Sequence, residues 1–294
     1  MPGHRHIAIT DPAGEPVTLA PMPARRSSIR AGTGAVARGT GAPWLRPRHL
    51  RRLRVALHDG ALTTLHVARH DLRRTVARVV RLPVPMPLER WCRDEGIDEA
   101  IVGGFFVRPG GAPLGELRTS GIARATLPFD APWAAVRGCL HVARGELAIA
   151  RRGELPADPA GDLLQAGPLL VRRGEPCVAG DHEGFSAGAG QFDSDITAGR
   201  YPRAALALTA RRELLAVACD GRADDEAGLT LEELAETLVA LGAVDALNLD
   251  GGGSTSLVCA GRLRNVPREE HGVVLGGGRP VSTAIAFTSR QRFG

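Results

Sequence analysis

The sequence has no lysine, a single tyrosine and only 4% aromatic residues among its 294 positions. It has no run of about 18 apolar residues, the length that a membrane-spanning helix requires. The N-terminus lacks the short apolar core of a secretory signal. We therefore expect a protein without a membrane span that stays in the cytoplasm. Gly and Pro, by contrast, number 37 and 21, which is typical of β-rich chains with many turns.

The basic charge is concentrated at one end of the chain. Residues 1–54 hold ten arginines against Asp11 and Glu15, a net charge of +8, whereas the other 240 residues, with 27 arginines and 30 acidic residues, carry −3. A nucleic-acid-binding surface would interleave aromatic residues with such charges, but Trp44 is the only one in this segment. We interpret residues 1–50 as a flexible basic tail before one domain, residues 51–294, with no nucleic acid as partner.

Cysteine and histidine show no recognisable framework. The five cysteines are odd in number and include no C-x-x-C spacing, so free buried thiols are expected. The nine histidines show no spacing typical of metal ligands. Neither residue type therefore indicates a disulfide or a metal site.

Short apolar strands separated by Gly and Pro dominate the chain. Alternation of apolar and polar residues around Asp59-Gly60 predicts a hairpin. Thr230 and Glu233 form a capping box before an amphipathic helix that Gly242 should end. Further hairpins are expected in residues 139–154, 166–175, 203–222 and 254–266. Together these patterns predict an α+β protein with a mixed, largely antiparallel sheet core and few helices.

The most informative segment is residues 248–255, NLDGGGST, which ends a buried strand. Consecutive glycines occur where φ is positive or where a ligand approaches the backbone closely. Their amides can form a nest that binds an anion, with Asp250 at its rim and Ser254 and Thr255 as hydroxyl donors. A tight turn whose aspartate bonds its own amides fits equally well. The GxxxxGK[ST] loop is absent, and so is a GxGxxG that opens a helix.

A second carboxylate, Asp220, ends another buried strand and stands two positions before Arg222. The two side chains could pair with each other, or Arg222 could bind a phosphate while Asp220 transfers a proton. Arg203 and Arg279 lie beside Pro or Gly at the entrance to strands. Each arginine alone is typical of a solvated surface charge, but three of them beside two strand-end aspartates indicate an anion site.

A third feature is the Gly103-Gly104 turn followed by Phe105. It is typical of a hydrophobic corner, and the alternative is a wall on which a sugar ring stacks. The turn also belongs to a pattern of helix, glycine, apolar strand and glycine-rich turn that occurs at 87–104 and again at 230–253. This echo predicts a pseudo-repeat.

The order of these segments resembles the phosphodiester glycosidase family. The matching segments cover residues 60–288 and read AIVGGFF, PLGEL, AGPLLV, YPRAALAL, ACDGR, GLTLEELA, LGAVDALNLDGGGSTSLV, RNVP and GRPVSTAIAF. The family includes the uncovering enzyme, which removes N-acetylglucosamine from a GlcNAc-1-phospho-6-mannose diester, and its bacterial members are often labelled as exopolysaccharide-related. Val102 and Val107 stand where the family usually has an asparagine and an acidic residue.

The resemblance implies a hydrolase that cleaves the glycosidic bond of a sugar-1-phosphate diester, releasing free sugar and a phosphomonoester. Asp250 is the first candidate for the nucleophile or base, and Asp220 is the second. No cofactor is expected, with a divalent cation near Asp250 as the alternative. The candidates for binding the phosphorylated or anionic glycan are Arg203, Arg222, Arg279, Asn248, Gly251, Gly252, Gly253, Ser254, Thr255, Gly103, Gly104 and Phe105.

Two other functions fit the same residues. A non-catalytic module that binds anionic glycans would keep the glycine turn and the arginines without a poised carboxylate. A metal-dependent phosphodiesterase would cut the P–O bond instead of the C–O bond. Turnover of a sugar-phosphate diester separates the first from a glycosidase, and the destination of ¹⁸O from labelled water separates the second.

Overall fold

Antiparallel strand pairing organises the chain. The computed structural model describes residues 7–17, 49–179, 182–185 and 199–290. In these ranges every ladder between two strands is antiparallel, and an isolated bridge between Leu114 and Leu127 is parallel. Three α-helices accompany them there, which confirms the α+β class. None of these helices is long and apolar enough to cross a membrane.

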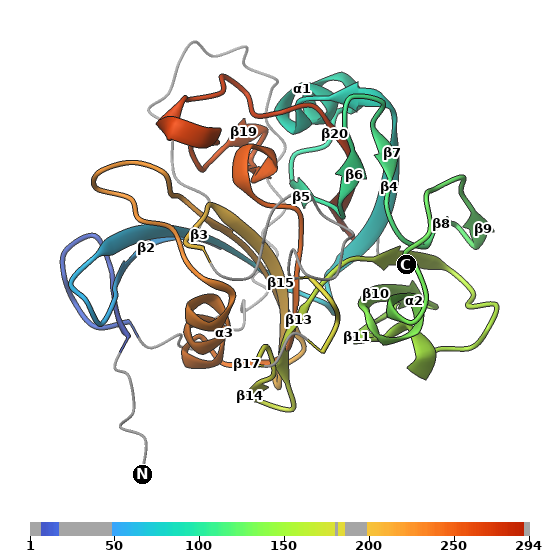
Figure 1. Ribbon diagram of the computed structural model, residues 1–294, viewed down its shortest axis with the longest axis horizontal. Helices are drawn as coiled ribbons and strands as arrows, with labels where there is room; N and C mark the ends of the chain where they lie inside the picture. Colours follow the sequence, from blue (N-terminus) through green and yellow to red (C-terminus); the bar gives the residue numbers. More distant parts are fainter. Residues whose placement is uncertain (1–6, 18–48, 180–181, 186–198, 291–294) are drawn as a thin grey trace, which may run out of the picture.

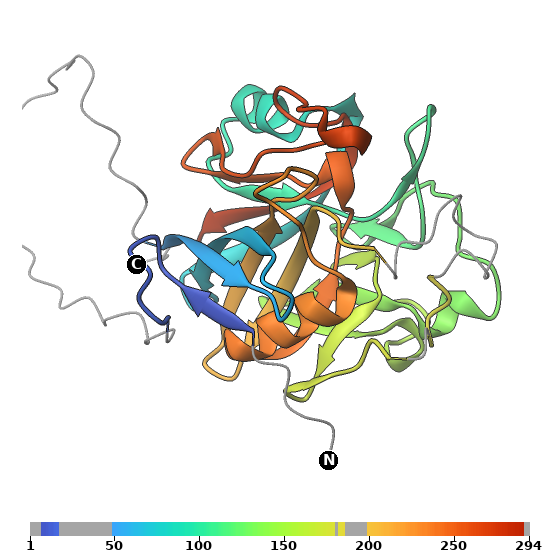
Figure 2. The same ribbon diagram turned by 60° about the vertical axis from the view of Figure 1, so that its left-hand side comes forward.

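The largest sheet has eight strands and forms the centre of the fold. In spatial order they are β1 (Ala8–Thr10), β2 (Leu50–Ala56), β3 (Leu62–Asp71), β16 (Glu213–Cys219), β15 (Arg203–Thr209), β17 (Ala243–Asn248), β13 (Leu169–Arg172) and β14 (Glu175–Pro176). Helix α3 (Leu231–Ala240), orange in Figures 1 and 2, lies against one face of this main sheet. Strands of a second sheet pack against the other face.

The smaller sheets complete the fold. The second sheet consists of β19 (Arg262–Leu263), β18 (Leu257–Cys259), β5 (Ala100–Val102), β20 (Val281–Ser289) and β4 (Thr75–Met86), with α1 (Leu88–Glu95) beside it. The third consists of β11 (Glu146–Arg151), β10 (Gly138–Ala143), β12 (Asp162–Gln165), β8 (Leu117–Thr119) and β9 (Ile122–Ala123), with α2 (Trp133–Val136) close by. A ribbon joins β6 (Phe106–Val107) to β7 (Ala112–Pro113).

Two apolar layers cover the two faces of the main sheet. Leu234 and Leu238, four residues apart on α3, belong to the layer that also contains Ala246 of β17. The next residue of that strand, Leu247, belongs to the opposite layer together with Ile285 of β20. Because side chains alternate along a strand, β17 presents apolar side chains to both faces of the sheet, and its second half, Ala246–Asn248, is fully buried.

Helix ends follow the capping chemistry expected from the sequence. The Thr230 hydroxyl accepts the Glu233 amide at 3.1 Å, and the Glu233 carboxylate accepts the Thr230 amide at 2.9 Å. Gly242 follows α3 with φ of +89°, and Gly96 follows α1 with φ of +66°. Both glycines therefore adopt the left-handed conformation that glycine favours at the end of a helix.

The predicted echo of helix, glycine, strand and glycine turn recurs in the structure. One copy runs through α1 and β5 and the other through α3 and β17, and the two strands belong to different sheets. The glycine turns after the strands meet, since the Asp250 amide donates to the Gly103 carbonyl at 3.0 Å. The two sheets are thus joined at the point where the candidate carboxylate lies.

The structure corrects part of the predicted tail. Residues 8–10 pair with β2 as an additional edge strand, and Ile7, Ile9 and Val17 pack against the apolar layer under α3. A charge count over the whole basic segment does not reveal these few apolar residues. In the structure they cover β2, which would otherwise be an exposed edge strand. Residues 18–48 lie outside the described residues.

Ile9→Asp should lower the melting temperature by about 3–6 °C, because a charge replaces a half-buried apolar side chain worth roughly 1–2 kcal/mol. The neighbouring Ala8 is exposed, so Ala8→Asp is a matched control that should leave the melting temperature nearly unchanged. Thermal unfolding of both variants is the measurement. Equal melting temperatures for the two variants would show that β1 adds nothing to stability.

Candidate active site

Two central strands of the main sheet end close to each other. Strand β15 runs antiparallel to both neighbours, with Arg203 opposite Cys219 of β16 and Ala205 opposite Asn248 of β17. The carboxyl ends of β16 and β17 therefore lie on either side of the start of β15. Asp220 and Asp250 follow these ends, so two strand spacings, or about 10 Å, separate their backbones.

The turn holds Asp250 in place through its backbone and its side chain. Its amide is bound to Gly103 of the neighbouring turn. Its Oδ1 accepts the Gly251 amide at 3.0 Å. The second carboxylate oxygen is not used by this contact. Asp250 is therefore fixed to both sheets while it keeps hydrogen-bonding capacity on the half-buried side chain.

The environment of Asp250 changes its acidity. Burial raises the pKa of Asp250 to about 6, although a hydrogen bond from Ser254 and the charges of Arg279 and Arg108 oppose the shift. A carboxyl with this pKa gains and loses a proton near neutral pH, which an ordinary exposed aspartate does not do. Arg108 lies shortly after the Gly103-Gly104 turn, and no pattern in the sequence indicated that it belongs to the site.

The three glycines form a tight turn that protein groups approach closely. Gly252 has φ of +59° and begins the 3₁₀ turn η3 (Gly252–Ser254). Its amide donates to the Pro202 carbonyl at 2.9 Å, and a Cβ at Gly253 would lie 2.8 Å from a carboxylate oxygen of Glu269. The amides of Gly251 and Gly252 are thus bound within the protein, as in a turn that is braced internally.

Arg279 and Glu269 form an ion pair beside this turn. The Nε of Arg279 donates to Glu269 at 2.7 Å, its Nη2 donates to the second carboxylate oxygen, and its Nη1 lies 3.4 Å from the Ser254 hydroxyl. The hydrogen bonds from Arg279 lower the pKa of Glu269. Near Ser254, the pKa of Asp250 is therefore raised and that of Glu269 is lowered. This arrangement provides one carboxyl group that can exchange a proton and another that stays ionised.

Arg222 also lies close to the glycine turn. A Cβ at Gly252 would lie 3.4 Å from its Nη1. The guanidinium carbon is 5.2 Å from the centroid of the Tyr201 ring, and Nη1 donates to the Arg268 carbonyl at 3.3 Å. Arg222 itself has φ of +59°, a strained conformation for a residue with a side chain. The backbone thus directs this arginine to the turn.

Arg203 is placed differently. It is buried, and its guanidinium donates to the Leu229 carbonyl at 3.0 Å and to the Gly199 carbonyl at 2.8 Å. Burial lowers the pKa of Arg203 to about 10. These contacts join the segment before β15 to the segment before α3. Arg203 therefore stabilises the loops around the start of β15.

Asp220 is bound at both carboxylate oxygens. Its Oδ2 lies 2.9 Å from His66 Nε2, and its Oδ1 accepts the Val266 amide at 2.7 Å. His66 comes from β3, opposite Ala218 of β16. Sequence reasoning missed this histidine because only the strand register brings it to Asp220. The pair fixes the imidazole, whereas Asp250 has the less constrained carboxylate.

Several buried side-chain polar atoms near the end of β17 and in the segments that follow it have no hydrogen-bond partner within the described ranges. These include Asn248 Oδ1, Thr255 Oγ1, Ser256 Oγ and Arg268 Nη1. Asn248 Nδ2, by contrast, donates to the Gly167 carbonyl at 2.9 Å. Proteins rarely leave such atoms without water, an ion or a ligand that completes their hydrogen bonds. Thr255 and Ser256 directly follow the glycine turn, so this segment can bind a polar ligand.

The first glycine turn is packed tightly. A Cβ at Gly103 would lie 2.4 Å from Thr283 Oγ1, and one at Gly104 would lie 3.1 Å from the Gln165 carbonyl. The Phe105 ring is buried 5.6 Å from that of Phe185 in a small apolar cluster. The Phe105 side chain therefore forms part of a hydrophobic corner.

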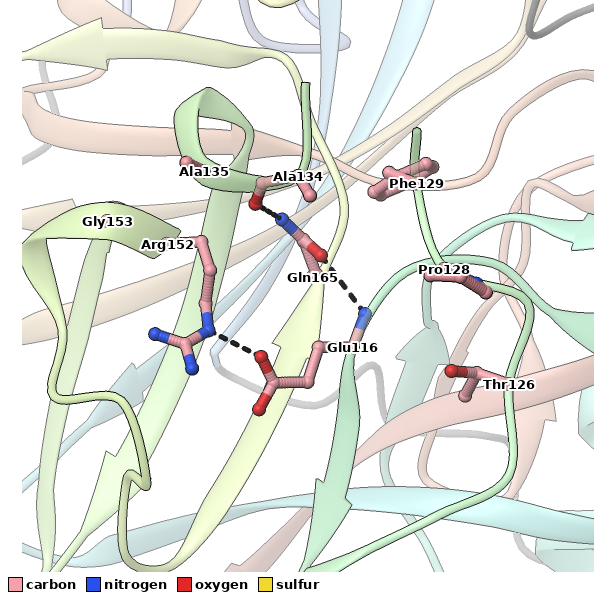
Figure 3. Close-up of a pocket in the computed structure, with 9 residues that line it drawn as sticks. All are labelled: Glu116, Thr126, Pro128, Phe129, Ala134, Ala135, Arg152, Gly153 and Gln165. Atoms are coloured by element: carbon pink, nitrogen blue, oxygen red, sulfur yellow. Dashed lines mark hydrogen bonds and ion pairs between the residues drawn. The ribbon is translucent and has the colours of Figure 1, made fainter. Parts of the chain in front are cut away.

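An open pocket of about 480 Å³ lies beyond this turn (Figure 3). Gln165 and Phe129 line it, and both are linked to the turn, one through Gly104 and the other through the Phe105 cluster. Two charged side chains of the pocket, Glu116 and Arg152, pair with each other at 2.5 Å. The charges of these two side chains therefore compensate each other within the pocket.

Possible metal ligands gather elsewhere. In the part of the chain that the structure describes, one group of three such side chains comes together: His49, Glu99 and Cys259, with ligand atoms within 4.8 Å of one another. His49 and Cys259 are 210 residues apart, so no sequence spacing could indicate the group. It contains neither Asp250 nor Asp220.

The fold is shared with known structures. The catalytic domain of zebrafish N-acetylglucosamine-1-phosphodiester alpha-N-acetylglucosaminidase, auto-inhibited by its pro-peptide, superimposes with a TM-score of 0.63 at 18% identity over 82% of each chain. A hypothetical protein from Synechocystis has a TM-score of 0.58 at 19% identity, and the match covers 85% of this chain and 64% of that one. A Burkholderia pseudomallei protein has a TM-score of 0.58 at 17% identity, covering 80% of this chain and 76% of its own.

Sequence comparison defines the family. No curated protein sequence matches this chain. The sequence model of the phosphodiester glycosidases matches residues 95–288. That range is well over half of the chain and contains both glycine turns, both strand-end aspartates and the Arg279–Glu269 pair. The chain therefore belongs to the phosphodiester glycosidase family.

Proposed function

We propose that this protein hydrolyses a sugar-1-phosphate diester at its glycosidic C–O bond, releasing free sugar and a phosphomonoester. The observation that carries the proposal is the placement of Asp250, a carboxyl with its pKa raised to about 6, beside Ser254 and Arg279 at the glycine turn. Family membership supports it, as do the hydroxyl groups of Thr255 and Ser256, which directly follow the glycine turn and have no partner among the described residues.

The arginines are suited to the leaving group. A phosphomonoester leaves readily, so stabilisation of its charge matters more than its protonation. Arg222 and Arg279 flank the glycine turn, and Arg108 is close enough to affect the charge of Asp250. Guanidinium groups can bind phosphate oxygens bidentately. We assign the phosphate to the space between these three side chains.

Asp250 supplies the carboxylate that attack at the anomeric carbon requires. It acts either as the nucleophile or as the base that removes a proton from water. In both cases the oxygen of water ends on the anomeric carbon, the bond from that carbon to the phosphate oxygen breaks, and its electron pair leaves with the phosphomonoester. Glu269 remains ionised and holds Arg279 in position.

This role predicts an acidic limit in the pH profile. If Asp250 must be ionised, kcat/KM should fall about tenfold per pH unit below about pH 6, where burial has placed the pKa of this carboxyl. A profile measured from pH 4 to 8 on the wild-type protein tests the assignment. Activity that rises steadily as the pH falls below 6 would show that the protonated form acts, so Asp250 would be an acid instead.

The bond that is cleaved can be determined directly. Hydrolysis of synthetic sugar-1-phosphate methyl diesters in ¹⁸O water should place the label in the sugar. Label in methyl phosphate would show P–O cleavage and overturn the glycosidase proposal in favour of a phosphodiesterase. Saturable binding of every diester without turnover of any would indicate a glycan-binding module instead.

A further inference from the structure

Four polar side chains form a cluster far from Asp250, namely those of His49, His70, Glu99 and Cys259. His70 lies four residues after His66 in β3, and Glu99 lies four residues before Gly103 at the start of β5. Four residues of strand span on the order of 13 Å. The cluster is therefore separate from the candidate active site, and the proposed hydrolysis does not use it.

Strand pairing and the chain after residue 48 bring the cluster together. Ala100 of β5 pairs with Val258 of β18, so Glu99 and Cys259 lie side by side next to this pair. His49 immediately precedes β2 of the main sheet. The cluster thus joins the main sheet to the second sheet, with ligand atoms from both.

The distances between the polar atoms are short. His49 Nε2 lies 2.6 Å from Glu99 Oε1 and 3.3 Å from Cys259 Sγ. Cys259 Sγ lies 3.8 Å from the same Glu99 oxygen. Bond lengths of about 2.0–2.3 Å in a tetrahedral zinc site place neighbouring ligand atoms roughly 3.3–3.6 Å apart. A shift of less than about 1 Å in each contact would therefore convert this triangle into one face of such a site.

We propose that His49, Glu99 and Cys259 bind a zinc ion that fastens the start of β2 to the second sheet. Imidazole, carboxylate and thiolate are the three ligand types that zinc uses in proteins. A carboxylate and a thiolate together balance the charge of the divalent ion. His49 is half-buried, with 27% of its side chain exposed, which leaves room for water at the fourth position.

His70 supports the same interpretation from behind Glu99. Its Nδ1 lies 3.3 Å from the second oxygen of Glu99, and its ring stacks on Phe287 with centroids 4.2 Å apart. Its Nε2 is buried without a hydrogen-bond partner in the described part of the chain. Groups that hold a ligating carboxylate or histidine in this way commonly orient metal sites. His70 is thus a positioning residue and not a ligand.

A reactive cysteine is the competing explanation, and the geometry opposes it. Cys259 is fully buried, which favours the neutral thiol over the nucleophilic thiolate. The same nitrogen of His49 faces both the thiol and Glu99, whereas a relay would use the two different nitrogens of the ring. Zinc binding requires only that the metal displace the thiol proton.

Cobalt substitution tests the proposal in the full-length protein. After chelation and dialysis, one equivalent of Co²⁺ should produce a thiolate-to-cobalt charge-transfer band, and Zn²⁺ should displace it. This band reports sulfur ligation, so histidines elsewhere in the chain cannot produce it. Zn²⁺ should also raise the melting temperature by several degrees, because the ion binds the folded protein.

Matched variants locate the site. Cys259→Ser should abolish the band and weaken Zn²⁺ binding at least about 100-fold, because a ligand is lost. His70→Phe removes a residue that only positions a ligand, so it should weaken Zn²⁺ binding about tenfold. Cys92→Ser is the control, since Cys92 is an equally buried thiol on α1, and it should keep the band.

Two results would overturn the proposal: no charge-transfer band in the wild-type protein, or a band that persists in Cys259→Ser. If Cys259→Ser does not fold, the wild-type spectrum and Glu99→Gln decide, since Glu99→Gln should also weaken binding at least about 100-fold. The hydrolytic assay is independent of this outcome because neither His49 nor Cys259 lies near Asp250.

Discussion

Asp250→Asn should lower kcat by about 100-fold or more, the scale of a lost acid-base or nucleophilic group. The melting temperature should stay the same or rise. Burial raises the pKa of Asp250 from 3.8 in the unfolded chain to about 6 in the folded protein. The ionised form therefore costs stability at neutral pH, and this cost disappears as the pH falls from 6 through 3.8. Asparagine carries no charge and avoids the cost.

The two possible roles of Asp250 affect different measurements. Steady-state kinetics and thermal unfolding at pH 7 separate catalysis from turn bracing, for which the change should cost about 1 kcal/mol with turnover retained. Asp245→Asn, in the strand that leads to Asp250, is the matched control, because Asp245 pairs with Arg172 away from the glycine turn. Wild-type kcat in Asp250→Asn would remove this carboxylate from the mechanism.

Arg279→Gln should lower kcat/KM by about 100-fold, since a charged hydrogen-bond donor to phosphate contributes roughly 1.5–3 kcal/mol. It should also change the pH profile. Arg279 lowers the pKa of Glu269 and opposes the upward shift at Asp250. Without it, the pKa of Asp250 rises further, so the acidic limit of activity should move to higher pH. Kinetics across pH 5–9 test both effects.

Arg172→Gln is the control for this prediction, because Arg172 pairs with Glu154 and with Asp245, which precedes the glycine turn by several residues. It should leave both kcat/KM and the pH profile unchanged. A loss of kcat/KM in Arg279→Gln with an unmoved acidic limit would show that Arg279 binds substrate without affecting Asp250. An unchanged kcat/KM would exclude Arg279 from the phosphate site.

Local patterns could predict the elements because each depends on neighbouring residues. The Thr230–Glu233 capping box, the glycine stops after α1 and α3, and the hairpin at Asp59-Gly60 all follow from interactions within a few positions. The short β1 was missed because three or four apolar residues give little periodicity. Its pairing depends on an open edge of β2, which exists only after the sheet has formed.

Local sequence is sufficient to identify Asp250 as a carboxylate that stands between a buried strand and a glycine turn, because strand burial and glycine conformation are local properties. The contacts of the candidate site, in contrast, depend on the tertiary structure. Strand register joins His66 to Asp220, and a loop brings Glu269 to Arg279. Strand pairing places Glu99 beside Cys259, and the packing of two sheets adds His49, which is 210 residues from Cys259 in the chain. Contacts of this kind depend on how sheets pack, and packing is a property of the whole chain.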